Sequence, residues 1–137
     1  MNDIRIIDTH CHLDFNELKT RLDEVIKDAK INNVTDMVTI STNLSRIDTI
    51  KDISEQYQEV FFTVGVHPNE AHKDKQYDDH YFIENYSNHE KCVGIGEGGL
   101  DYFYNMDNMK LQKRSLEVQI NAVSYTHLRA HETVRNR

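Results

Sequence analysis

Four short apolar runs alternate with amphipathic segments along this chain, and this alternation constrains the fold more than any other feature. Each run has the length and the β-branched or aromatic content of a buried strand. Strands separated by helical segments form parallel pairs, because parallel neighbours need a long crossover connection. The sequence therefore predicts an α/β fold built from parallel βα units. The four predicted strands cover residues 4–8, 37–40, 60–66 and 92–95.

The segments between the runs carry apolar side chains three and four positions apart, as do helices that pack on a sheet. Thr42 or Asn43 is suited to cap the second helix. The last helix is expected to turn Leu116 and Ile120 inward. The predicted helices cover residues 18–29, 44–57, 81–86 (the weakest pattern) and 109–122.

Composition limits the function classes. The chain has 137 residues, the size of one domain, and its formal charge of -7 argues against a basic face that tracks a nucleic-acid backbone. Cys11 and Cys92 lie far apart, outside any Cys-x-x-Cys pattern, which favours buried thiols in a reducing compartment. No stretch approaches the roughly 18 apolar residues that cross a bilayer. We therefore expect a cytoplasmic protein without a membrane function.

Two imidazoles, His10 and His12, directly follow the first apolar run. Side chains two positions apart on a strand point to the same face, so both rings can approach one cation. Imidazole is a common nitrogen ligand of divalent metals near neutral pH. Asp8 and Asp14 flank the pair and are candidates to orient a ring by hydrogen bonding. The alternative is a chance His-x-His triplet in a chain with eight histidines.

A glycine-rich turn ends the fourth run and carries Glu97, with Asp101 four residues further on. Glycine permits close approach of a ligand to the backbone. A phosphate cradle is the rival interpretation, but the turn lacks the Gly-Lys-Ser/Thr ending of a P-loop and the spacing of a dinucleotide fingerprint. We predict that Glu97 is a metal ligand able to bridge two cations. Asp101 is expected to hydrogen-bond a ligand or cap the next turn.

His67 follows the third run, which stops at Pro68 because proline removes a ladder donor. It is either a chance histidine in this turn or a pocket residue that contacts substrate or a metal-bound water. In parallel sheets, sites are assembled at the carboxyl ends of the strands. We therefore expect one site at this edge, formed by His10, His12, His67, Glu97 and Asp101.

Three signatures occur in order, Ile-Asp-Thr-His-Cys-His-Leu-Asp at 7–14, Gly-Val-His-Pro at 65–68 and Gly-Glu-Gly-Gly-Leu-Asp-Tyr at 96–102. Over residues 1–122 the chain thereby resembles the TatD-type metal-dependent deoxyribonucleases of the amidohydrolase-like superfamily. The resemblance implies about half of a TIM-type (β/α)₈ barrel. It also implies one or two divalent cations, such as magnesium, manganese or zinc, that serve the hydrolysis of phosphodiester bonds in DNA, often as an exonuclease.

In that family the matching histidine pair and glutamate are metal ligands, which implies this role for His10, His12 and Glu97. We predict that Glu97, His67 and Asp101 take part in catalysis. One departure is Gly98, where the family usually has a larger apolar residue. We expect this glycine to loosen the turn around Glu97.

A closed eight-stranded barrel needs roughly 250 residues, whereas four strands are predicted here. Half a barrel exposes two strand edges and an apolar interior, which favours aggregation. Residues 123–137 read like a translated sequencing-library adapter and contain three arginines but one glutamate. We therefore predict that residues 1–122 are the N-terminal half of a barrel, that residues 123–137 are a non-native tail, and that the chain is inactive by itself.

His127 and Arg129 imitate the His-x-Arg that follows the next strand in the family. We expect no ligand at His127, because too few residues separate it from Gln119 to end the helix, turn and form a strand.

Two alternatives to a TatD-like nuclease stay open. A related amidohydrolase-type barrel would act on an amide, lactone or phosphotriester, usually with a carboxylated lysine or another bridging ligand where this chain offers Glu97. A non-catalytic fragment would bind metal only. The sequence leaves the physiological metal, the choice between DNA and RNA, and the oligomeric state open.

Overall fold

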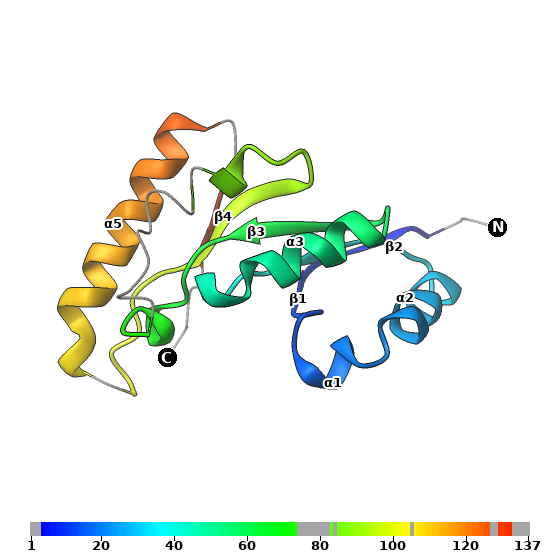
Figure 1. Ribbon diagram of the computed structural model, residues 1–137, viewed down its shortest axis with the longest axis horizontal. Coiled ribbons are helices and arrows are strands. Elements are labelled where there is room, and N and C mark those ends of the chain that lie inside the picture. The colour runs from blue at the N-terminus through cyan, green and yellow to red at the C-terminus, as the bar shows by residue number, and fades with distance from the viewer. Residues whose placement is uncertain (1–3, 74–82, 84, 105, 127–128, 133–137) are drawn as a thin grey trace.

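The computed structural model describes residues 4–73, 83, 85–104, 106–126 and 129–132, and it contains one parallel sheet (Figure 1). The strands lie in chain order, and every neighbouring pair is parallel. The predicted α/β class with parallel βα units is confirmed. The strands are β1 (Ile6–Cys11), β2 (Val34–Thr39), β3 (Val60–Val64), β4 (Cys92–Gly98) and β5 (Arg129–Glu132).

The helices between these strands match the crossover segments that the sequence predicts, with shifted ends. The first predicted helix is split in two around Thr20 and Arg21, and the second begins with a 3₁₀ turn. Most of the predicted helix at 81–86 lies outside the described residues. The helical elements are α1 (Asn16–Lys19), α2 (Leu22–Ile31), η1 (Leu44–Arg46), α3 (Ile47–Gln56), η2 (Pro68–Glu70), η4 (Met106–Asn108) and α5 (Met109–Tyr125). None of the described helices has the length and apolar character needed to cross a bilayer.

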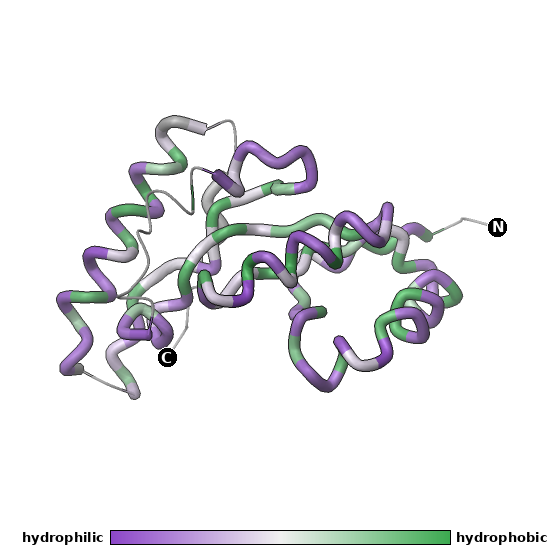
Figure 2. The backbone as a smooth tube through the Cα atoms, viewed as in Figure 1, coloured by the Kyte–Doolittle hydropathy of each residue, from purple (hydrophilic) through white to green (hydrophobic). Residues whose placement is uncertain are grey.

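The core lies between the sheet and the helices α2, α3 and α5. Phe62 and Val64 of β3 are fully buried against Ile47 and Ile50 of the η1–α3 segment, in a cluster that continues to β4 and α5. A second cluster joins α2 to β2 around Ile26. Figure 2 shows apolar residues in green along much of the strands and an alternation of green and purple along the helices, as expected for helices with one buried face.

Apolar side chains remain exposed on β1 and β4. Ile6 and Ile7 are 45% and 58% exposed, and Val93 is 41% exposed. β1 is an edge strand of the described sheet, and β4 lies next to the other edge. Ile6 and Ile7 are consecutive residues, so their side chains point to opposite faces of the sheet. Neither face of β1 is therefore fully covered by the described residues.

The fifth strand corrects the sequence prediction. The chain was expected to have four strands and too few residues after Gln119 for another. Instead α5 continues to Tyr125, and β5 begins at Arg129 beside β4. His127 itself lies outside the described residues.

The orientation of α5 also differs from the prediction. Ile120 is 57% exposed, whereas Gln112, Ser115 and Gln119 are buried. The apolar pattern gave a wrong prediction because this helix turns polar side chains toward the loops that follow β3 and β4. The expected helix cap is also absent, since Asn43 precedes η1 without a side-chain capping bond and Arg46 holds the cap position of α3.

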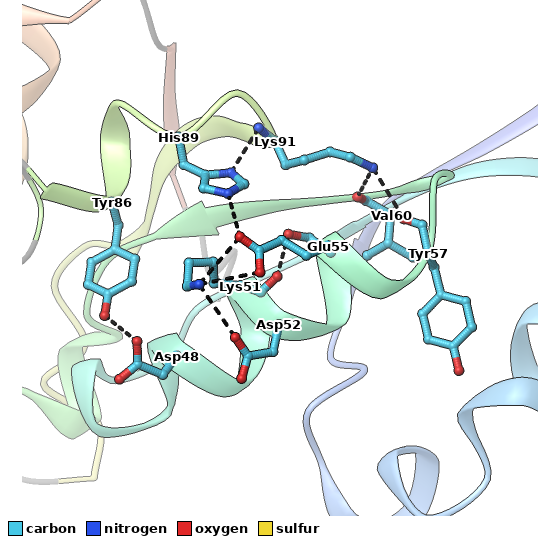
Figure 3. A network of polar contacts seen from close by, with 10 residues as sticks. Asp48, Lys51, Asp52, Glu55, Tyr57, Val60, Tyr86, His89 and Lys91 are labelled. Atoms are coloured by element: carbon cyan, nitrogen blue, oxygen red, sulfur yellow. Dashed lines mark hydrogen bonds and ion pairs between the residues drawn. The ribbon is translucent and has the colours of Figure 1, made fainter.

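A polar network connects α3 to the amino ends of β3 and β4, at the end of the sheet away from the histidine pair (Figure 3). The ammonium group of Lys91 donates to the carbonyl oxygens of Tyr57, Gln58 and Val60 at 2.6–3.2 Å. His89 Nε2 lies 3.0 Å from a carboxylate oxygen of Glu55 on α3. This hydrogen bond lowers the pKa of Glu55. The network links α3 to the segment before β4, far along the strands from the histidine pair.

Candidate metal centre

The carboxyl ends of the strands are tied together by buried hydroxyl groups. Thr63 Oγ1 donates to the carbonyl of Gly96 at 2.7 Å and accepts from the Ser41 amide at 3.2 Å. Ser41 Oγ donates to the Gly65 carbonyl at 2.8 Å, and the Glu97 amide donates to the Ser41 carbonyl at 2.9 Å. These bonds fix the backbone from which the candidate ligands project.

His10, His12 and Glu97 converge at this edge. One ligand atom from each lies within 4.8 Å of the others. The Nε2 atom of His10 is 3.6 Å from Oε2 of Glu97. Glu97 is only 6% exposed, so its carboxylate is held away from bulk water beside two imidazoles. The structure brings together the three donors that the sequence singled out, and their role as ligands remains a prediction.

The ring of His12 is oriented by the backbone. Its Nδ1 donates to the Ile40 carbonyl at 3.1 Å, which leaves the Nε2 lone pair for an ion. The flanking carboxylates act differently from the prediction. Asp8 accepts the backbone amide of His10 at 3.0 Å, and Asp14 pairs with Arg46 at 2.9 Å.

His67 stands on the other side of the same carboxylate. Its Nδ1 accepts the Asn69 amide at 3.1 Å and so caps η2. In the neutral ring Nε2 then carries the hydrogen, and this atom lies 3.8 Å from Oε1 of Glu97. The geometry makes His67 a donor toward the site, and among the described residues it does not belong to the group of metal donors.

Asp101 is not brought to the donors. Its carboxylate accepts the Phe103 amide at 3.1 Å and the Asn69 side-chain amide at 3.2 Å. It therefore caps the turn after β4, which is one of its two expected roles, and ties this turn to η2.

An open cavity of about 580 Å³ lies beside the donors. His12, His67 and Glu97 form part of its wall, and Arg46 and Lys73 add two cationic groups. Sequence reasoning missed these two residues. For Arg46 a usable signal was the polar segment after the second strand, the one strand for which no site residue was proposed. Lys73 follows the third strand, where His67 was already proposed.

Aromatic stacking supports the ring of His12 from this cavity. Phe15 lies parallel to it with ring centroids 4.7 Å apart, and the guanidinium of Arg46 covers the Phe15 ring at 4.9 Å. The Asp14 carboxylate that holds Arg46 is 1% exposed. Burial raises the pKa of Asp14, against the opposing effect of Arg46.

The thiol between the two imidazoles is not a candidate ligand in its present environment. Burial, followed by the negative charges of Asp8 and Asp14, raises the pKa of Cys11 to about 12. A thiol must be deprotonated to bind metal or act as a nucleophile. Its hydrogen instead points to the Val38 carbonyl at 3.4 Å.

The donor set fits a divalent cation. A buried carboxylate beside two imidazoles, one with its Nε2 lone pair left free, is the combination that zinc and related ions accept.

Comparison with known proteins identifies the family. A family model described as TatD related DNase matches residues 7–129. An uncharacterized metal-dependent hydrolase of Buchnera aphidicola subsp. Baizongia pistaciae is 35% identical over 111 residues, covering 79% of this chain and 41% of that protein. The uncharacterized metal-dependent hydrolase YabD of Bacillus subtilis is 35% identical over 115 residues, covering 84% and 45%.

Solved structures show the same fold. YjjV, a TatD homolog from Escherichia coli K12, superposes with a TM-score of 0.87 at 23% identity, covering 95% of this chain and 51% of that one. A hydrolase TatD family protein from Entamoeba histolytica gives a TM-score of 0.81 at 22% identity, covering 96% and 50%. The sheet is therefore a curled half of a TIM-type barrel, as predicted.

The chain spans about half the length of the relatives that it matches. The family match covers most of the chain. Two of the three sequence signatures, at 7–14 and 96–102, supply the candidate donors that meet at the strand ends. This chain belongs to the TatD-related DNase family of metal-dependent hydrolases.

Proposed function

We propose that this chain supplies the metal centre of a cytoplasmic phosphodiesterase that acts on DNA. The observation that carries the proposal is the convergence of His10, His12 and Glu97 at the carboxyl ends of β1 and β4. The description of the family model as a DNase supports the substrate class. The names of the relatives support metal-dependent hydrolysis without specifying a substrate.

Magnesium, manganese or zinc would be held by one nitrogen each of His10 and His12 and by the carboxylate of Glu97. When bound, a divalent cation supplies Lewis acidity, because it draws charge from a phosphate oxygen and makes a water molecule more acidic. Glu97 has a second carboxylate oxygen, which gives the chain the means to contact a second cation.

The remaining residues would bind and orient the phosphate. His67 would donate its Nε2 hydrogen to a phosphate oxygen, since this atom faces the same carboxylate as the two histidines. Arg46 and Lys73 line the cavity and would offer hydrogen-bond donors to a phosphate. Each pairs with a carboxylate, Arg46 with Asp14 and Lys73 with Glu70, so the bound cation would supply most of the positive charge. Asp101 would serve catalysis indirectly, by holding Asn69 beside His67.

The test is an assay of manganese binding and of nucleotide release from labelled single-stranded DNA. His10→Ala and Glu97→Gln should each weaken manganese binding by at least about tenfold, because each removes a ligand. His89→Ala is the matched control, since its ring pairs with Glu55 in another part of the molecule. DNA hydrolysis that needs metal and is lost only in the first two variants supports the proposal.

Metal binding and hydrolysis are measured separately. The chain spans about half the length of its relatives, so it can hold the metal ligands without the other residues that hydrolysis needs. Metal affinity that depends on His10 and Glu97 without DNA hydrolysis is the result expected if the chain is inactive by itself, and it supports the metal centre alone; DNA hydrolysis is then assayed on a chain of the relatives' full length. Hydrolysis of a lactone, amide or phosphotriester in place of DNA would favour another amidohydrolase-type activity. Manganese affinity unchanged by both substitutions would contradict the metal centre itself.

A further inference from the structure

Helix α5 buries two glutamines on the face that it turns toward the site. Gln112 is 1% exposed and Gln119 is 4% exposed. They are seven positions apart, about two helical turns, so they lie on the same face. Glutamine is mostly found at protein surfaces, and burying its amide costs free energy unless every polar atom is paired. The sequence predictions assigned no role to either side chain.

Gln112 holds the turn after β4. Its Oε1 accepts the Asp101 amide at 2.8 Å, and its Nε2 donates to the Asp101 carbonyl at 2.8 Å. Both backbone groups of one residue are thus bound by one side chain, as an adjacent strand would bind them. This turn carries the carboxylate that contacts Asn69.

Gln119 holds the end of β3 in the same way. Its Oε1 accepts the Val66 amide at 3.3 Å, and its Nε2 donates to the Val66 carbonyl at 3.1 Å. The side chain fills the space above two glycines. A Cβ atom placed on Gly65 or Gly98 would lie 2.5 or 2.8 Å from Oε1 of Gln119.

The two glutamines converge on His67 by separate routes. Gln119 fixes the residue directly before it. Gln112 fixes Asp101, whose Oδ2 accepts the side-chain amide of Asn69, and the backbone amide of Asn69 donates to His67 Nδ1. Both routes favour the ring orientation in which Nε2 faces Glu97.

We propose that Gln112 and Gln119 are positioning residues that together hold His67 with Nδ1 as acceptor and the Nε2 hydrogen directed at the site. They act through Val66, Asp101 and Asn69 and contact neither the donors nor the cavity. The inference rests on the proposed function only where it assumes that His67 donates its Nε2 hydrogen to a phosphate oxygen. Its geometric content can be tested on the metal-free chain.

The experiment is nuclear magnetic resonance of the metal-free chain with ¹⁵N-labelled histidine, recorded near pH ~8, where imidazoles are neutral. Long-range proton–nitrogen correlations identify the ring nitrogen that carries the hydrogen. Wild type should show His67 with hydrogen on Nε2. His12 is an internal reference, because its Nδ1 hydrogen is held by the carbonyl of Ile40, the residue directly after β2.

The variants are Gln112→Leu and Gln119→Leu, with Val118→Ala as the matched control. Val118 is buried on the same helix but contributes to the apolar cluster. Each leucine variant should move the His67 nitrogens toward the average of two tautomers and leave His12 unchanged. Val118→Ala should change neither ring.

Gln119→Glu provides a variant that keeps the packing if leucine prevents folding. It retains the acceptor for the Val66 amide but loses the donor to the Val66 carbonyl, so a smaller shift of the same sign is expected at His67. His67 signals unchanged in the folded variants would overturn the proposal. So would equal changes at His67 and His12, because they would show general loosening. Neither result depends on whether the chain hydrolyses DNA.

Discussion

Among single residues, Asp14 determines how the wall of the cavity is built. Its buried carboxylate pairs with Arg46, which covers Phe15, which in turn stacks on the ring of His12. One charge at the end of β1 thereby supports the position of a candidate metal ligand. The two carboxylates beside the histidine pair serve the backbone and this stack, whereas the sequence suggested that they would bind the rings.

Arg46→Met should destabilise the fold by about 2 kcal/mol, because it leaves a buried carboxylate without its partner. Urea unfolding measures the change. Arg21→Met is the control, because Arg21 forms only an exposed pair with Glu24 at 3.9 Å and such pairs contribute little. An equal decrease in the free energy of unfolding in the two variants would show that the buried Arg46–Asp14 pair stabilises the fold no more than an exposed pair.

Burial raises the pKa of the Cys92 thiol to about 11, from an ordinary value of 9.0. Fewer thiolates are present at neutral pH, so alkylation of Cys92 should be about 100-fold slower in the folded chain than in urea, and it should accelerate as pH rises. Mass spectrometry after timed iodoacetamide treatment measures this. Rapid modification of folded protein at Cys92 would contradict the burial seen in the structure.

The candidate donors could be found from sequence, but their supports could not. His10, His12 and Glu97 stand directly at strand ends, where chain order alone places side chains on one edge of a parallel sheet. Phe15 and Gln119 reach the site through packing between elements distant in the chain. No local pattern marks such contacts.

Among the elements, β4 and α5 fit each other through the space above Gly98. The sequence suggested that this glycine loosens the turn around Glu97. The structure shows the amide of Gln119 occupying the position that a larger side chain would need. The segment is therefore filled from a neighbouring helix.

Gly98→Ala should cost about 1–3 kcal/mol, because the new methyl group would overlap with a hydrogen-bonded amide. Combined with Gln119→Ala, which vacates the space, the same substitution should cost less, and a double-mutant cycle by urea unfolding measures the difference. If Gly98→Ala costs the same in both backgrounds, the two side chains do not compete for space.

The first four strands and the helices α2 and α3 were predictable because apolar runs and helical spacing persist in the sequence, whereas β5 was missed because its residues form no apolar run. The orientation of α5 was not, since its buried face carries glutamines in place of leucines and isoleucines. The break between α1 and α2 was also missed, because the apolar spacing continues from Leu18 to Leu22 across it. The spacing of apolar residues predicts which face of a helix is buried only where the buried side chains are apolar.

At the scale of the whole molecule, the chain forms a curled half-barrel with its candidate donors at one end. Two of the three donors come from β1 and one from β4, on the two sides of β2 and β3. An ion bound among them would therefore connect distant parts of the sheet. It would bind the folded state only.

Manganese at 100 times its dissociation constant should stabilise the fold by about 2.7 kcal/mol and raise Tm by on the order of 8 °C. Differential scanning calorimetry measures the shift, and a chelator should reverse it. His89→Ala should respond like wild type. A Tm that does not respond to manganese in wild type, or that rises equally in His10→Ala, would contradict binding at the proposed site.

The most direct measurement is anomalous diffraction at the zinc edge from crystals of this chain grown with zinc. The account predicts a peak within about 2.0–2.2 Å of one nitrogen of His10, one nitrogen of His12 and one oxygen of Glu97. A well-occupied peak elsewhere on the chain, with these three side chains unliganded, would contradict it.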